Sequence, residues 1–502
     1  MVVATSKWPP QLTESQLDSL SLLATTYALA HGLLYLPPGS QSSSTIPTSA
    51  IHAPITLFPT PIPRRLFEQA QKVQSIYNNL YARVALDDAF LDKVMGAVEG
   101  VGRVDDFVGR LWAGWKKHPM VQSLHLGLFR SDYLLHEDQS GASTFKQVEF
   151  NTISSSFGPL SSQTAKMHRY LLASTGYYGS DPVLNTSNMP VNNTLSGLVE
   201  GLVFSHRAYG NESARILFVV QDGERNIFDQ RWLEYELLEK HSIRVLRKTL
   251  TILGKAATLE RDNALYVYSD SDEQPFEIST VYYRAGYTPD DYPTESHYET
   301  RFLLNSSRAI QCPSIPLQLA GGKKVQEVLS RPGVLEDFLL NELRGPERFN
   351  FQDVEQLRAS WMDMWSLDLN GDQGVDDARS QHQNLVLKPQ REGGGNNIYK
   401  ESIPTFLDGL KESEREAWIA MKLIQPPQNI YNWLIRAGGG TTGRVKTDIV
   451  SEVGIFGYAL FGKDRPIVEE EAGWLVRTKG RESDEGGVAV GFSVLDSIIL
   501  VD

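Results

Sequence analysis

The chain has 502 residues, 41% of them hydrophobic and 22% charged, as in an ordinary soluble globular protein of roughly two to four domains. Its 48 basic and 61 acidic residues give a net charge of −13, which argues against a general nucleic-acid binder and against docking on an anionic membrane. The only cysteine, Cys312, excludes an intrachain disulfide and suits a reducing compartment.

The N-terminal segment MVVATSKWPP lacks the apolar core of a signal peptide, and no stretch of about 18 uninterrupted apolar residues predicts a transmembrane helix. We therefore expect a cytoplasmic protein without a membrane partner. The four N-x-S/T sites are then expected to be chance matches; they are Asn185, Asn192, Asn211 and Asn305.

The first predicted element is an amphipathic helix over residues 13–32, with a capping box formed by Thr13 and Gln16. Residues 37–63 are rich in Ser, Thr and Pro and predict an extended connection, of which 41–49 is expected to be the most mobile part. Helical spacing returns over residues 65–98.

Residues 123–151 predict two strands around an acidic loop, and helices are predicted over 161–178 and 193–208. At Ala214 the pattern changes to ARILFVVQ, RWLEYELLEKH and IRVLRKTL, a strand–helix–strand alternation. This alternation indicates a small βαβ-type domain that ends near Gly321 and Gly322.

Residues 325–365 are predicted to be helical, 384–398 to form a strand with a glycine loop, and 448–461 and 487–495 to form glycine-rich strands. The acidic segment 368–372 imitates the start of an EF-hand. Because Gln373 and Arg379 stand where that loop needs glycine and glutamate, we interpret it as a solvated loop.

The stretch LVLKPQREGGGNNIY carries the strongest chemical signal. A buried strand delivers Lys388, after which Glu392 precedes the triplet Gly393–Gly394–Gly395 and the pair Asn396–Asn397. A glycine triplet reaches φ > 0 without penalty and can direct its N–H groups at phosphate oxygens. Lysine adds a point charge for phosphate, and glutamate can hold Mg²⁺. The spacing fits neither a P-loop nor a Rossmann fingerprint.

The segment QVEFNTISSSFG suggests the rest of a magnesium site. Glu149 and Asn151 share one face of a strand, and with Glu392 they form a credible set of oxygen ligands, although an edge polar pair is the commoner meaning of such a spacing. The hydroxyl run Ser154–Ser156 suits either polar substrate groups or a simple turn.

Arg130, Arg284 and Arg477 each follow an apolar strand-like run and need an anionic partner, either a ligand or a structural carboxylate. With three lysines they suggest an electropositive cavity for a nucleotide and a peptide carboxylate; these are Lys323, Lys388 and Lys479. Glu452 could accept from ribose hydroxyls or pair with an arginine.

These residues also carry a family resemblance. LKPQREGGGNNIY, QVEFNTISSSFG, ERNIFDQR, YYRAGY, SEVGIFGYALFG and LVRTK…GGVAVGFSVLD resemble, in order and over most of the chain, the eukaryotic glutathione synthetases. The resemblance implies an α/β, circularly permuted ATP-grasp fold with an inserted substrate-binding domain and a glycine-rich lid. The corresponding division is 1–213 and 325–502 for the ATP-grasp parts and 214–324 for the substrate-binding domain.

The resemblance implies a homodimeric ligase that joins γ-glutamylcysteine to glycine with ATP and Mg²⁺, and we expect two Mg²⁺ per active site. The γ-phosphoryl group would activate the dipeptide carboxylate as an acyl phosphate, which the glycine amine attacks. No covalent enzyme intermediate is expected. The alternatives are a related ligase that uses β-alanine or serine, and a nucleotide-binding regulator without catalysis.

The resemblance carries roles to individual residues. Metal ligands are Glu149, Asn151 and Glu392. Catalytic charges are Arg130, Lys323, Lys388 and Arg477. ATP contacts are Glu149, Lys323, Lys388, Gln390, Glu392, Gly393, Gly394, Gly395, Asn396, Asn397, Tyr399, Met421, Lys422, Leu423, Ile424, Glu452, Lys479 and Glu485. Peptide contacts are Arg130, Ser154, Ser155, Ser156, Glu224, Asn226, Gln230, Arg284, Tyr287, Arg477, Val488 and Ala489.

One segment departs from the family pattern. Where the family tends to read MEKI on the adenine side, this chain has Met421–Lys422–Leu423–Ile424, so side-chain contacts to the base are altered while backbone contacts can survive. The stretch near Gln41 and the run 438–443 also look lengthened.

Overall fold

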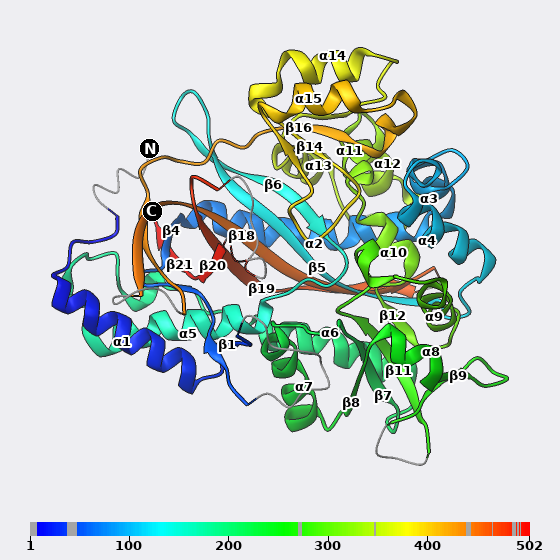
Figure 1. Ribbon diagram of the computed structural model, residues 1–502, viewed down its shortest axis with the longest axis horizontal. Helices are drawn as coiled ribbons and strands as arrows, with labels where there is room; N and C mark the ends of the chain where they lie inside the picture. Colours follow the sequence, from blue (N-terminus) through cyan, green and yellow to red (C-terminus); the bar gives the residue numbers. More distant parts are fainter. Residues whose placement is uncertain are drawn as a thin grey trace.

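The computed structural model in Figure 1 describes residues 8–37, 48–269, 274–345, 348–437, 443–463, 465–483, 488, 491 and 493–502. It is a mixed α/β protein, as predicted, built around one 13-stranded sheet and a smaller 4-stranded sheet. Two 2-stranded sheets complete it; they pair β1 (Leu34–Tyr35) with β2 (Ile51–His52), and β4 (Thr60–Pro63) with β21 (Ile498–Val501).

The large sheet runs in the order β17-β3-β20-β19-β18-β5-β12-β11-β10-β9, with β6 beside β5 and with β7 linking β11 to β8. Its strands are β3 (Ile55–Thr56), β5 (Leu124–Glu137), β6 (Ser143–Asn151), β7 (Arg215–Val219), β8 (Val245–Lys248), β9 (Ala257–Leu259), β10 (Leu265–Val267), β11 (Phe276–Tyr283), β12 (Ile310–Cys312), β17 (Tyr431–Ile435), β18 (Arg444–Gly462), β19 (Arg465–Gly480) and β20 (Ser493–Asp496).

The sheet has an antiparallel half and a parallel half. β6, β5, β18 and β19 are antiparallel neighbours, whereas β5, β12, β11, β7 and β8 run parallel. Parallel neighbours need a crossover, which the helix α7 (Ile227–His241) supplies between β7 and β8. The predicted strand–helix–strand unit is therefore confirmed, while the proposed division into domains at 213 and 324 stays a prediction.

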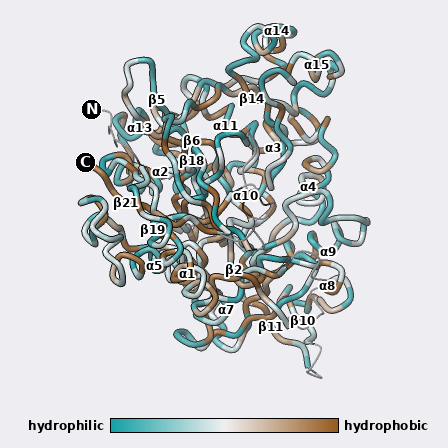
Figure 2. Tube along the Cα trace, turned by 60° about the vertical axis from the view of Figure 1, so that its left-hand side comes forward, coloured by the Kyte–Doolittle hydropathy of each residue, from teal (hydrophilic) through white to brown (hydrophobic). Residues whose placement is uncertain are grey.

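Helices cover both faces of this sheet. α2 (Arg64–Leu86) packs with one layer of the apolar core, and α5 (Gly158–Thr175) and α6 (Thr194–Tyr209) pack with the other. Figure 2 shows hydrophobic positions running along the central strands, with hydrophilic stretches at the periphery. The other α-helices are α1 (Glu14–Ala30), α3 (Asp88–Met95), α4 (Asp106–Lys117), α8 (Leu250–Ala256), α9 (Glu295–Asn305), α10 (Ile315–Ala320), α11 (Lys323–Ser330), α12 (Val334–Leu340), α13 (Phe351–Ala359), α14 (Gln373–Ser380) and α15 (Ser402–Gly409).

The alternation of side chains along β5 explains where the helical cover stops. Successive residues of a strand point to opposite faces, so Leu126, Leu128, Arg130 and Asp132 share one face. Leu126 and Leu128 belong to the core layer of α5 and α6. The same face then becomes charged at Arg130 and Asp132, where a cavity replaces the apolar packing.

The smaller sheet lies at the top of Figure 1, in yellow and orange, next to α14 and α15. Its order is β13 (Met364–Ser366), β16 (Ile419–Lys422), β14 (Leu385–Lys388) and β15 (Ile398–Tyr399). It has its own small apolar core, which includes Leu385, Leu387 and Ile403. The hairpin of β14 and β15 carries the glycine-rich loop, as predicted from its sequence.

The expectation of helix over residues 325–365 is wrong in part. The region is broken into α11, α12 and α13 and ends in strand β13. Pro332 cannot continue a helix, and Gly333 takes φ of 82° as the cap of α12. The strand expected over 487–495 is also wrong in part, because the described residues 488 and 491 are turn and β20 begins only at Ser493. The other helices and strands predicted in the described residues are found with bounds shifted by a few residues. The expected mobility of 41–49 falls mainly on 41–47, outside the described residues.

The acidic segment 368–372 forms a loop that leads into α14, as the sequence indicates. Its carboxylates pair with cations of the protein: Asp368 with Lys324 at 3.0 Å and Asp372 with Arg415 at 2.6 Å. Among the helices of the described residues, none has the length and apolar character needed to cross a membrane.

A buried histidine joins α5 to the edge of the large sheet. The ring of His168 contacts Ser497 Oγ through Nδ1 (2.7 Å) and the Thr56 carbonyl through Nε2 (3.0 Å), and it is inaccessible to solvent. Burial disfavours the charged ring and lowers its pKa to about 4. In the unfolded chain the imidazole of His168 takes up a proton near pH 6.5, whereas in the folded protein it stays neutral down to about pH 4. The neutral ring therefore contributes to folding stability above about pH 6.5, and this contribution is lost as the pH falls toward 4.

We predict that His168→Gln, which can keep both hydrogen bonds, makes thermal stability less sensitive to acid. Between pH 7 and pH 5 the free energy of unfolding of the wild-type protein should fall by about 2 kcal/mol more than that of the variant, because only the histidine takes up a proton on unfolding. Calorimetry at both pH values measures the difference. His31→Gln at an exposed site is the control, and equal acid sensitivity of the His168 variant and the wild type would contradict the assignment.

Candidate active site

A cavity of about 600 Å³ lies between the charged face of β5 and β6, the end of β19 and the glycine-rich loop. Of the residues predicted from sequence, these line it: Arg130, Glu149, Asn151, Ser154, Ser156, Tyr287, Lys323, Lys388, Glu392, Gly393, Gly394, Asn396, Asn397, Tyr399, Met421, Lys422, Leu423, Ile424, Glu452, Arg477, Lys479 and Val488. The structure thus brings together groups that lie more than 300 residues apart in the chain.

Strand register aligns the first of these groups. Arg130 of β5 pairs with Asn151 of β6, and Asp132 pairs with Glu149. The register shifts between Asp132 and Tyr133, which leaves Val148 as the extra residue of a bulge. The bulged carbonyl of Val148 accepts a hydrogen bond of 2.7 Å from Lys388 Nζ. The expectation that Glu149 and Asn151 face the same way is therefore confirmed.

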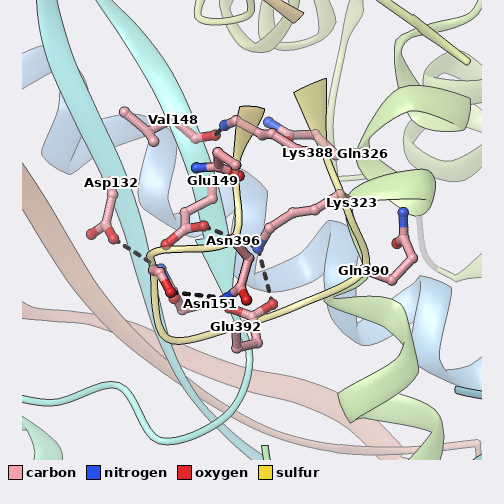
Figure 3. Close-up of polar contacts among 12 residues, drawn as sticks. Asp132, Val148, Glu149, Asn151, Lys323, Gln326, Lys388, Gln390, Glu392 and Asn396 are labelled. Atoms are coloured by element: carbon pink, nitrogen blue, oxygen red, sulfur yellow. Dashed lines mark hydrogen bonds and ion pairs between the residues drawn. The ribbon is translucent and has the colours of Figure 1, made fainter. Parts of the chain in front are cut away.

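An ammonium group lies between the two candidate metal-binding carboxylates (Figure 3). Lys323 Nζ is 3.0 Å from Glu149 Oε2 and 2.9 Å from Glu392 Oε1. Lys323 is the first residue of α11 and directly follows the pair Gly321–Gly322, so the start of this helix sets the direction of its side chain. The lysine side chain is only 5% exposed, whereas the carboxylates are 25% and 22% exposed toward the cavity.

The two carboxylates that share the Lys323 ammonium have pKa values shifted in opposite directions. Burial raises the pKa of Glu392 to about 7, because the attraction of Lys323 is partly cancelled by the charge of Glu149. Burial also opposes ionisation of Glu149, but the attraction of Lys323 and Lys388 outweighs it and lowers its pKa. Burial lowers the pKa of Lys388 to about 8. Strongly shifted groups gathered in one cavity are typical of a functional site.

The donor set fits a magnesium ion. Asn151 Nδ2 donates to Asp132 Oδ2 (2.9 Å) and to the Arg130 carbonyl (3.2 Å), which leaves the amide oxygen as the remaining acceptor. Together with Glu149 and Glu392 it offers a few hard oxygens, as Mg²⁺ prefers when phosphate and water complete its octahedron. Within the described ranges, no group of three or more His, Cys, Asp or Glu suggests another metal site.

The glycine-rich loop adopts the backbone that its sequence predicts. Gly393, Gly394 and Gly395 have φ of 95°, 73° and 76°, in the left-handed region that side chains disfavour. Ahead of the triplet, Arg391 is held by Asp105 at 2.5 Å, so the loop is anchored on one side to the start of α4. Gln390 is also tied down, because it accepts from the Lys324 N–H (3.0 Å) and donates to the Ala417 carbonyl (3.1 Å).

The arginines of the site find carboxylates inside the protein. Arg130 forms a two-pronged ion pair with Asp132, with Nε and Nη2 at 2.6 and 2.8 Å. Arg477 contacts the same Asp132 at 3.1 Å and also pairs with Glu452, its partner across β18 and β19. Of the two readings of Glu452, the structure shows the ion pair with arginine. Asp132 was missed from sequence, although the i, i+2 spacing in LFRSDY could have indicated it.

Of the predicted residues that the structure describes, seven are not part of the cavity wall: Ser155, Glu224, Asn226, Gln230, Arg284, Gln390 and Gly395. Arg284 is 4% exposed, donates to the Ser155 carbonyl (3.0 Å) and lies 3.8 Å from Asp229, a carboxylate that the sequence analysis also missed. Glu224 accepts from the backbone N–H of Asn226 (2.7 Å).

Two buried polar atoms in this group, Asn226 Oδ1 and Arg284 Nε, have no hydrogen-bond partner within the described residues. Buried polar atoms are nearly always satisfied, so a ligand or water is expected to reach them. This fits their predicted role in peptide binding without placing them in the cavity wall itself.

The remaining predicted residues lie at the edges of the site. Lys422, the last residue of β16, pairs with Asp363 at 2.6 Å, and Leu423 N, directly after the strand, donates to the Asn384 carbonyl (2.8 Å). Val488 is buried against the cavity, whereas Glu485 and Ala489 lie outside the described residues.

Comparison with known proteins identifies the family. A family model described as the eukaryotic glutathione synthase ATP-binding domain matches residues 14–500. The chain is 38% identical over 492 residues to the glutathione synthetase of Xenopus laevis, covering 97% of each, and 40% identical over 491 residues to that of Bos taurus, covering 96% of this chain and 97% of the relative. The chain belongs to the eukaryotic glutathione synthase family.

A solved structure supports the fold of this glutathione synthase family member. A glutathione synthetase-like effector from Globodera pallida matches with a TM-score of 0.75 and 22% identity, covering 98% of both chains. The likeness is consistent with an ATP-grasp-type fold. The resemblance inferred from the glycine loop and from QVEFNTISSSFG is confirmed.

We predict that Lys323→Met destabilises the protein in the absence of metal, because Glu149 and Glu392 lose their shared ammonium. They must then either repel each other as two buried anions or take up a proton at Glu392, whose pKa is already raised to about 7. The melting temperature should fall by about 2–4 °C at neutral pH, and millimolar Mg²⁺ should restore part of the loss by replacing the ammonium. The loss should shrink in acid, since protonation of either carboxylate removes the repulsion. Thermal scans with and without Mg²⁺ measure this.

Lys388→Met serves as the matched control, because its ammonium bonds to a carbonyl rather than bridging two carboxylates. A Lys323 variant that Mg²⁺ stabilises no more than it stabilises this control would refute the proposed exchange of ammonium for metal.

Proposed function

We propose that the protein is a glutathione synthase, a ligase that joins γ-glutamylcysteine to glycine at the expense of ATP. The observation that carries the proposal is the placement of Lys323 between Glu149 and Glu392, beneath a glycine triplet with left-handed φ angles. The many relatives named glutathione synthetase, at about 38–40% identity over nearly the whole chain, support the same reaction.

A free carboxylate does not accept an amine, because its oxygen is a poor leaving group. Transfer of the γ-phosphoryl group of ATP to the dipeptide carboxylate gives an acyl phosphate, and the glycine amine then displaces phosphate. Such a reaction needs positioning and charge neutralisation more than covalent help from the enzyme. Magnesium, when bound by Glu149, Asn151 and Glu392, would supply positive charge to the phosphate oxygens.

The protein's own cations have distinct parts in this proposal. Lys323 and Lys388 neutralise phosphate oxygens from the floor of the cavity, where burial strengthens their electric field. Arg130 and Arg477, fixed by Asp132, orient the reacting carboxylate. Arg284 and Asn226, whose buried Nε and Oδ1 have no hydrogen-bond partner within the described residues, are assigned to the γ-glutamyl end of the dipeptide. The glycine loop excludes water, which would otherwise hydrolyse the acyl phosphate.

Several finer statements belong to the proposal. We assign two Mg²⁺ to each active site, a homodimer to the assembly and the cytoplasm to the protein. The adenine base is assigned to the segment Met421–Lys422–Leu423–Ile424, with backbone contacts in the main role because the ammonium of Lys422 already pairs with Asp363.

We predict that Glu392→Ala lowers turnover by about 100-fold or more at saturating Mg²⁺, because it removes both a metal ligand and a partner of Lys323. Steady-state measurement of phosphate release gives the number. The control is Glu401→Ala, an exposed glutamate near the same loop, which should keep normal turnover. Near-normal rates in the Glu392 variant would refute its role.

Phosphate release also separates the proposed reaction from its alternatives. We expect release with ATP and γ-glutamylcysteine to rise strongly on addition of glycine, with kcat/KM for β-alanine or serine about 10–200-fold lower, since small differences in size give only modest discrimination. Preference for β-alanine or serine would indicate the related ligase. No amine-dependent release, with intact nucleotide binding, would indicate a regulator.

A further inference from the structure

We propose that Asp132 is a positioning residue that couples the metal side of the site to its substrate side. It would do so by fixing the amide of Asn151 and the guanidinium groups of Arg130 and Arg477 at the same time. This inference rests on the proposed function and assigns a role to a residue that touches neither reacting group.

Asp132 makes four polar contacts within the site. Its Oδ1 accepts from Arg130 Nε (2.6 Å), and its Oδ2 accepts from Arg130 Nη2 (2.8 Å), Asn151 Nδ2 (2.9 Å) and Arg477 Nη2 (3.1 Å). The side chain is completely buried, at 0% exposure. A buried carboxylate must be compensated, and among the described residues its partners are Arg130, Asn151 and Arg477, all of which line the cavity.

The contact with Asn151 decides which end of its amide faces the cavity. An amide has two donors on nitrogen and an acceptor on oxygen. The Asn151 Nδ2 donates to Asp132 Oδ2 (Figure 3) and to the Arg130 carbonyl. The amide oxygen is therefore the atom left for a cation. An uncharged partner at position 132 would accept less strongly and could donate instead, which allows the amide to turn. Partners of this kind commonly tune metal affinity by about 10–100-fold.

The same carboxylate orients the two arginines. The two-pronged ion pair with Asp132 fixes the plane of the Arg130 guanidinium. The Nη2 of Arg477 contacts the same Asp132 Oδ2 and also pairs with Glu452. Gly454, opposite Asp132 on β18, makes room for this arrangement. A Cβ there would lie 2.8 Å from both Arg130 Cδ and Asp132 Oδ1.

The test compares Asp132→Asn with the wild type by two measurements. Mn²⁺ binding, followed by electron paramagnetic resonance with a non-hydrolysable ATP analogue and corrected for nucleotide alone, should weaken by about 10–100-fold. The KM for γ-glutamylcysteine should rise by about 10-fold or more, since Arg130 and Arg477 lose their common anchor, whereas the KM for ATP at saturating metal should change little.

A double-mutant cycle shows whether the metal effect passes through Asn151. In an Asn151→Ala background, Asp132→Asn should no longer change Mn²⁺ affinity, while its effect on the dipeptide KM should persist. Gly454→Ala, which presses on the same pair, should shift both quantities in the same direction by a smaller factor. The Gly454→Ala variant therefore tests the same positioning role if the Asp132→Asn protein does not fold.

Asp496→Asn is the matched control, because Asp496 is equally buried in the large sheet but bonds to Thr60, Thr478 and the Ser497 N–H instead. It should leave Mn²⁺ affinity and dipeptide KM within about threefold. The proposal is overturned if Asp132→Asn behaves like this control, or if its effect on Mn²⁺ is the same with and without Asn151. An inactive wild type would sink the proposed function alone, since the Mn²⁺ comparison needs no turnover.

Discussion

The arrangement of the site depends on buried charge that the protein itself must compensate. Glu149, Lys323 and Glu392 come from β6, α11 and the glycine loop, and they meet with oxygen–nitrogen distances of 3.0 and 2.9 Å. Unpaired charge of this kind would be expelled from a half-closed cavity or neutralised by a proton. Pairing holds the three segments together, and it also keeps a positive charge where a phosphate-bound cation would bring one.

A second group of charges, Asp132 with two arginines, lies on the strands of the large sheet that form one wall of the cavity. Asp132 binds Arg130 and Arg477 within paired strands, where backbone hydrogen bonds leave little freedom. In contrast, the loop above is built on three glycines and is anchored on one side by Arg391. The site therefore joins a floor of paired strands to a glycine loop with positive φ angles, and the proposed function assigns to that loop the role of closing over phosphate.

Overall charge and local charge have opposite signs in this protein. The chain carries a net charge of −13, yet the cavity of the candidate active site gathers arginines and lysines from several strands and one helix start. Several of these cations already have carboxylate partners, so an incoming anionic substrate competes with Asp132, Glu452 and Glu149 for them. Under the proposed function, a magnesium ion carried by the nucleotide would compensate the carboxylates while the phosphates are bound by the ammonium groups.

The sequence alone determined the local features: the strand before Lys388, the left-handed glycine triplet, the shared face of Glu149 and Asn151, and the alternation that gives β7, α7 and β8. Each follows from the periodicity or backbone freedom of adjacent residues. The helix break at Pro332 and Gly333 is likewise a local feature, because proline cannot continue a helix and glycine readily adopts a positive φ. Only the tertiary structure decided that Asp132 serves both arginines, that Lys323 bridges two carboxylates, and that Arg284 lies behind the cavity wall. The physical reason is that a charged side chain takes its partner from whichever strand or helix start packs beside it, and no local spacing records which one that will be.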